Sequence, residues 1–126
     1  MYAHTNRTLP IIGPVNLHIY QHQAENEVFA YIELKLPNHL KPLSLAELEP
    51  AVFMLNDTQN LTISHKHLLT HPNHTSLDYV TEDTKGNIIY CRTITAAEKL
   101  MSIIYISTAE HFSKQRHKQF FDALRW

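Results

Sequence analysis

Several features that would narrow the function of a protein are rare or missing in this sequence of 126 residues. It contains one cysteine, Cys91, so no disulfide can form within the chain. It contains two glycines, Gly13 and Gly86, too few for a phosphate-binding loop or a dinucleotide-binding fingerprint. The formal net charge is −1 with neutral histidines. This near-neutral balance argues against nucleic acid as a partner, because nucleic-acid binding relies on a strongly basic surface.

Long apolar runs are missing as well. The longest, residues 100–106, is interrupted by Ser102, whereas a membrane span needs about 20 apolar residues. The first four residues have neither the basic nor the apolar region of a signal peptide. We therefore expect no membrane span. The expected location is the periplasm or the cell envelope if a leader was removed, and the cytoplasm otherwise.

The length and composition that remain are those of one globular domain. Apolar residues make up 44% of the chain and charged residues 18%, both ordinary values. A chain of this size buries about two-thirds of its unfolded surface and needs no disulfide or metal to fold. We expect a single domain over residues 1–126.

Apolar side chains alternate with polar ones along two early segments, 15–23 and 28–36, which predicts two strands. Four further strands are expected after them. Residues 87–107 carry large apolar side chains on both faces, which is typical of strands at the centre of a sheet. Gly86 falls in the turn between two of these strands. The six predicted strands cover 15–23, 28–36, 61–70, 76–82, 87–95 and 99–107.

Two helices are expected around this sheet. One lies within 44–58, where Pro50 either kinks the helix or sits in the first turn of a second helix. The other spans 113–125, where apolar residues recur at helical spacing. The predicted fold class is therefore α+β, an antiparallel sheet of about six strands flanked by helices.

The order of these elements and a few aromatic segments are similar to a known family. The segments are 31–37 (YIELKLP), 90–93 (YCRT) and 120–124 (FFDAL). Together they resemble the Mog1/PsbP-like domains, including the bacterial DcrB-type domains. The resemblance implies an α/β/α sandwich. It also implies a binding module, assembly factor or chaperone rather than an enzyme.

No catalytic motif is present to oppose that expectation. The chain has neither a Gly-x-Ser-x-Gly elbow nor a His-Glu-x-x-His helix. Cys91 could act as a nucleophile beside a histidine, but its place in the middle of a strand favours a buried packing role. We expect no enzymatic activity.

Histidine is the one unusual residue type, with ten copies. His65 and His67 are two apart on a predicted strand and therefore share a face, and His71 and His74 follow in one loop. Neutral imidazoles at such spacing bind zinc or copper when three or four converge. The alternative is that histidine is merely frequent, since other copies are scattered along the chain.

Three aromatic side chains suggest a surface for a protein partner. Tyr20, Phe29 and Tyr31 belong to the first two predicted strands and fall on what can be one face. An uncovered aromatic patch is typical of partner-binding sites.

The sequence as a whole leaves three functional hypotheses. The first is a non-enzymatic binding or assembly module of a bacterial envelope or secretion system, acting through a sheet face or edge. The second is a metal-binding protein using the histidine cluster, and the third is a small enzyme of unknown chemistry.

Overall fold

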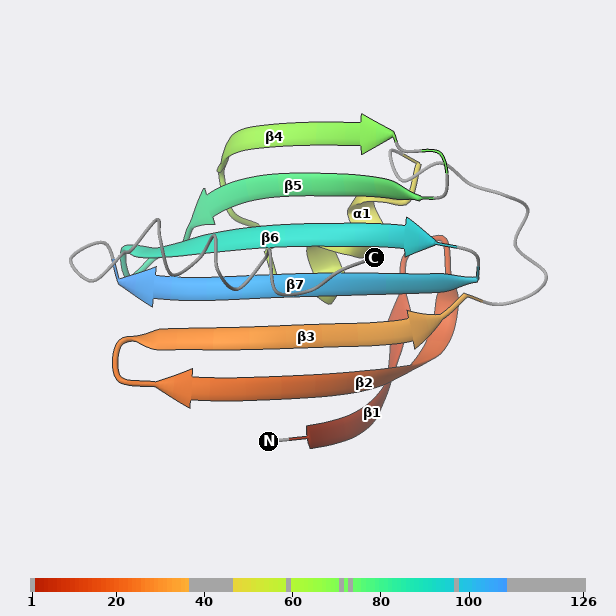
Figure 1. Ribbon diagram of the computed structural model, residues 1–126, viewed down its shortest axis with the longest axis horizontal. Helices are drawn as coiled ribbons and strands as arrows, with labels where there is room; N and C mark the ends of the chain where they lie inside the picture. The colour runs from red at the N-terminus through yellow and green to blue at the C-terminus, as the bar shows by residue number, and fades with distance from the viewer. Residues whose placement is uncertain are drawn as a thin grey trace.

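The computed structural model describes residues 2–36, 47–58, 60–70, 72, 74–96 and 98–108. Over these residues the chain forms one seven-stranded antiparallel sheet with the order β1-β2-β3-β7-β6-β5-β4 (Figure 1). One short helix, α1, lies against a single face of the sheet, behind it in Figure 1. The elements are β1 (Tyr2–Leu9), β2 (Gly13–Ala24), β3 (Glu27–Lys35), α1 (Glu49–Leu55), β4 (Ile63–Thr70), β5 (Thr75–Glu82), β6 (Asn87–Ala96) and β7 (Lys99–Thr108).

The sheet is built from two meanders that meet in the middle. Strands β1 to β3 are neighbours in sequence and in space, and so are β4 to β7. The two groups join where β3 pairs with β7, from Glu27 opposite Ser107 to Lys35 opposite Lys99. Gly86, with a φ of 85°, lies in the turn between the neighbouring antiparallel strands β5 and β6, which confirms the predicted hairpin.

The predicted fold class is wrong. Instead of about six strands flanked by helices, the described residues form seven strands and one helix of seven residues. Such a helix is about 10 Å long, whereas six spacings of about 4.8 Å make the sheet about 29 Å wide. This helix therefore covers only part of one face. The second predicted helix, at 113–125, lies outside the described residues.

The face that carries α1 holds the larger apolar core. Val52 and Leu55 of α1 are buried against sheet residues such as Leu34 and Leu100. The helix begins at Glu49 with Pro50 in its first turn, one of the two arrangements expected for this segment. Proline is tolerated there because its missing N–H would have no partner within the helix.

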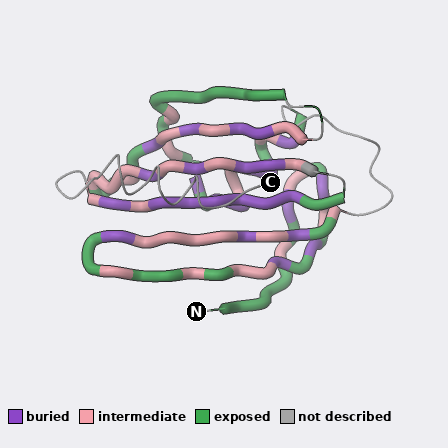
Figure 2. Tube along the Cα trace, in the orientation of Figure 1, coloured by how far each residue is buried: buried purple, intermediate pink, exposed green. Residues whose placement is uncertain are grey.

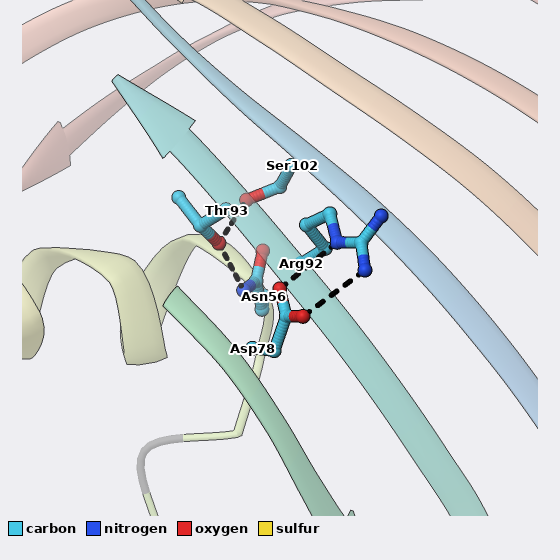
Figure 3. A network of polar contacts seen from close by, with 5 residues as sticks. All are labelled: Asn56, Asp78, Arg92, Thr93 and Ser102. Atoms are coloured by element: carbon cyan, nitrogen blue, oxygen red, sulfur yellow. Dashed lines mark hydrogen bonds and ion pairs between the residues drawn. The ribbon is translucent and has the colours of Figure 1, made fainter. Parts of the chain in front are cut away.

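A buried polar network fixes the end of α1 to the sheet (Figure 3). The Nδ2 atom of Asn56 donates hydrogen bonds to the hydroxyls of Tyr79 (2.9 Å) and Thr93 (3.1 Å). The Thr93 hydroxyl is in turn 2.7 Å from that of Ser102. All four side chains are buried, so these bonds satisfy polar atoms that water does not reach.

The opposite face contains a second cluster of buried residues, formed by Ile94, Met101, Ile103 and Tyr105. Strand β7 contributes to both clusters, since Leu100 and Ile104 belong to the first. Figure 2 shows most of β7 as buried, which confirms the predicted central position of this two-sided strand. The edge strands β1 and β4 are exposed along most of their length.

Candidate functional site

Aromatic and histidine side chains gather on β1, β2 and β3, on the face of the sheet opposite α1. Strand register places Tyr2 opposite Tyr20, and Tyr20 opposite Tyr31. His4 lies opposite His18 in the adjacent row. Register partners and residues two apart share one face of a sheet, so all five side chains project to the same side. We call Tyr2, His4, His18, Tyr20 and Tyr31 the aromatic patch.

The rings of the aromatic patch contact one another across the strands. The ring centroids of Tyr2 and Tyr20 are 4.9 Å apart, and those of Tyr20 and Tyr31 are 5.9 Å apart. The imidazoles of His4 and His18 stack at 4.9 Å with planes 23° apart. The Tyr2 hydroxyl is 2.7 Å from Nδ1 of His18. Tyr2 is 53% and Tyr20 49% exposed, so the patch presents apolar ring surface to solvent.

Charged groups beside the patch, on the same face of the sheet, hold Tyr31 in place. Its hydroxyl donates a hydrogen bond to Oε2 of Glu33 (3.0 Å), and Lys99 donates to Oε1 of the same carboxylate (2.9 Å). The hydrogen bond from Lys99 lowers the pKa of Glu33, outweighing the opposite effect of burial. Burial, and after it the Glu33 carboxylate, raises the pKa of Tyr31. Tyr31 is therefore a neutral phenol with a fixed orientation.

The three aromatic residues predicted for a partner site lie on one face of the sheet. Tyr20 and Tyr31 are neighbours in the patch. Phe29 lies on the same face, but its ring stands edge-on to buried Tyr105 with centroids 4.8 Å apart. Phe29 is only partly buried and packs against the second cluster, as Tyr31 also does. Tyr2 and His4 were not predicted as site residues, although their two-residue spacing is that of one face of a strand.

A separate hollow of about 510 Å³ lies over β4, β5 and β6. Its lining includes His65, His67 and Tyr90. It also includes an ion pair in which two nitrogens of the Arg92 guanidinium contact both carboxylate oxygens of Asp78. The two Arg92–Asp78 bonds measure 2.9 and 3.1 Å (Figure 3). Because Asp78 already accepts two bonds from Arg92, its charge is largely compensated within the hollow.

The predicted metal site is only partly covered by the described residues. His65 and His67 share a face of β4, as expected, and His74 precedes β5. His71 lies outside the described part of the chain. Among the residues that are described, no group of three or more histidine, cysteine, aspartate or glutamate side chains is placed to hold a metal ion. Zinc or copper binding therefore stays a prediction.

Cys91 is buried on the α1 face of β6. Burial raises the pKa of its thiol to about 12. A thiol with such a pKa is protonated at neutral pH and is a poor nucleophile, because the thiolate is the reactive form. The expected packing role of Cys91 agrees with this environment.

No match to this chain was found in comparisons with protein-family models, curated proteins and solved structures. Over the described residues, no helix has the length and apolar character needed to cross a membrane. What the chain does must therefore be argued from its own surface.

Proposed function

We propose that this domain is a non-enzymatic binding module that captures a protein partner on the aromatic patch. The observation that carries the proposal is the row of three tyrosines across β1, β2 and β3, two of which are about half exposed. Tyrosine is enriched among the residues that dominate protein interfaces, because it offers a large rigid ring and a hydroxyl at its tip.

The construction of the patch supports a docking role. Tyr31 is held by Glu33, and Glu33 by Lys99, so one ring of the row is oriented before any partner arrives. A side chain that is already ordered loses less conformational entropy on binding, which leaves more of the contact energy for affinity. The hydroxyl and imidazole groups around the rings provide polar contacts at the edge of the patch.

The surroundings of the cysteine thiol and of two carboxylates also favour binding over catalysis. The Cys91 thiol is buried and its pKa is raised. Asp78 is paired with Arg92, and Glu33 with Lys99. The cellular setting that we propose, a bacterial envelope or secretion system, rests on the resemblance to Mog1/PsbP-like domains alone.

Tyr20→Ala tests the proposal most simply. Tyr20 is exposed, so removing its ring should change the melting temperature little, whereas capture of the partner should fall at least about tenfold if Tyr20 is an anchor. The measurement is quantitative affinity enrichment from the native cell extract, comparing the wild-type domain with the variant.

Leu68→Ala is the matched control, because Leu68 is also an exposed apolar residue, 47% accessible, but lies on β4 at the other edge. The proposal predicts proteins that are lost with Tyr20→Ala and retained with Leu68→Ala. It is wrong if every enriched protein is retained by both variants.

A further inference from the structure

Strand β1 is an edge strand without the usual protection against pairing. Its ladder with β2 runs through eight consecutive register pairs, from Tyr2–Tyr20 to Leu9–Gly13, without a bulge. It contains no proline, and Arg7 is its only charged residue apart from ionisable histidine. Residues 2–6 are all exposed. An exposed, regular and nearly neutral edge presents unpaired N–H and C=O groups to another strand.

The other edge of the sheet differs in the features that prevent pairing. The register of β4 against β5 shifts between Ile63 and His65, which breaks the regular ladder. Lys66 lies in the middle of this strand and bonds Glu49 of α1 at 2.8 Å. Bulges and lysines are common means by which edge strands avoid association. The contrast singles out β1 as the edge that can accept a strand.

We propose that β1 pairs antiparallel with β1 of a second copy of this chain, so that two sheets continue into one. A register centred on Thr5 pairs residues 2–8 of each copy, the longest overlap of the strand that leaves out buried Leu9. Arg7 then lies opposite Ala3 of the second copy, and His4 opposite Asn6. No like charges face each other, whereas like charges placed directly opposite destabilise strand pairs.

The symmetry of this pairing determines where the two aromatic patches lie. The two-fold axis of an antiparallel pair of identical strands is perpendicular to the sheet, so both copies present the same face. The two patches therefore lie on one side of the continuous sheet, on either side of the axis. The dimer does not depend on the proposed function, but it would offer a partner two anchoring patches.

A charge test at the axis distinguishes this interface from others. Thr5 is exposed and would face Thr5 of the second copy, so Thr5→Lys places two positive charges opposite each other, and Thr5→Glu two negative ones. We expect the wild-type chain to sediment as a dimer over concentrations of about 10 to about 500 µM. Each variant should raise the dimer Kd at least about tenfold.

Mixing the two variants should restore the dimer, because lysine and glutamate then face each other across the axis. Thr70→Lys, at an exposed position of β4, is the matched control and should leave the dimer unchanged. Tyr20→Ala should also leave it unchanged, which separates this test from that of the proposed function. Circular dichroism verifies the fold of each variant.

Three outcomes would overturn the inference. One is a wild-type monomer at all concentrations, which would leave the β1 edge to a different occupant or to none. Another is a dimer that persists in both Thr5 variants. The third is a mixture of the two variants that remains monomeric.

Discussion

At the scale of single residues, the buried side chain of Asn56 connects the end of α1 to two strands of the sheet. Its amide joins Tyr79 of β5 and Thr93 of β6, and Tyr79 is also 2.7 Å from the hydroxyl of Thr58. Nothing in the sequence around residue 56 indicates this role, because the contacts join positions that are 23 and 37 residues apart. A tertiary polar network of this kind has no local signature.

Asn56→Ala should lower the free energy of unfolding by about 1–3 kcal/mol, because it leaves buried hydroxyls without their donor. The measurement is urea-induced unfolding followed by circular dichroism. Asn60→Ala, at an exposed position four residues on, is the control and should change stability by less than about 0.5 kcal/mol. Equal effects of the two substitutions would contradict the assigned network.

Glu33 makes a contribution to folding stability that depends on pH. Its pKa is lowered in the folded state by Lys99, so it stabilises the fold at pH values above its unfolded pKa of about 4.3. That contribution is lost as the pH falls through the folded-state value. Glu33→Gln should therefore be less stable than wild type at pH 7, and the difference should shrink in acid. A difference that grows on acidification would refute this assignment.

At the scale of elements, the positions of the strands were predicted better than the extent of the helices that cover the sheet. The six predicted strands correspond to β2 through β7, with ends that differ by at most two residues. Strand β1 was missed because an edge strand exposed on both faces shows no alternation of apolar and polar residues. The helix expected within 44–58 is confirmed, but its described span is only Glu49–Leu55.

Helix α1 is held mainly by its apolar side rather than by its ion pair with β4. Leu55→Ala removes a fully buried side chain and should cost about 2–5 kcal/mol. Lys66→Ala removes a partly exposed partner of Glu49 and should cost less than about 1 kcal/mol. Thermal or chemical unfolding of the two variants compares these costs. A larger loss of stability for Lys66→Ala than for Leu55→Ala would contradict the claim that apolar packing holds the helix.

At the scale of the whole molecule, the predicted sandwich was wrong because helical segments were counted as full layers. A two-turn helix covers part of one face only, and the second expected helix lies outside the described residues. The patch was foreseen only in part, since Tyr20 and Tyr31 belong to predicted strands whereas Tyr2 belongs to the missed one. Only the pairing of β1 with β2 places Tyr2 beside Tyr20 and so completes the row of three tyrosines.

The central claim is that the face carrying Tyr2, Tyr20 and Tyr31 contacts a protein partner. The most direct measurement replaces Tyr20 with a photo-crosslinking phenylalanine analogue and irradiates the domain in native cell extract. Position 68 on β4 carries the same analogue in the control. The account predicts a defined crosslinked protein from position 20 that is missing from position 68. The same crosslinks from both positions, or none from position 20, would contradict it.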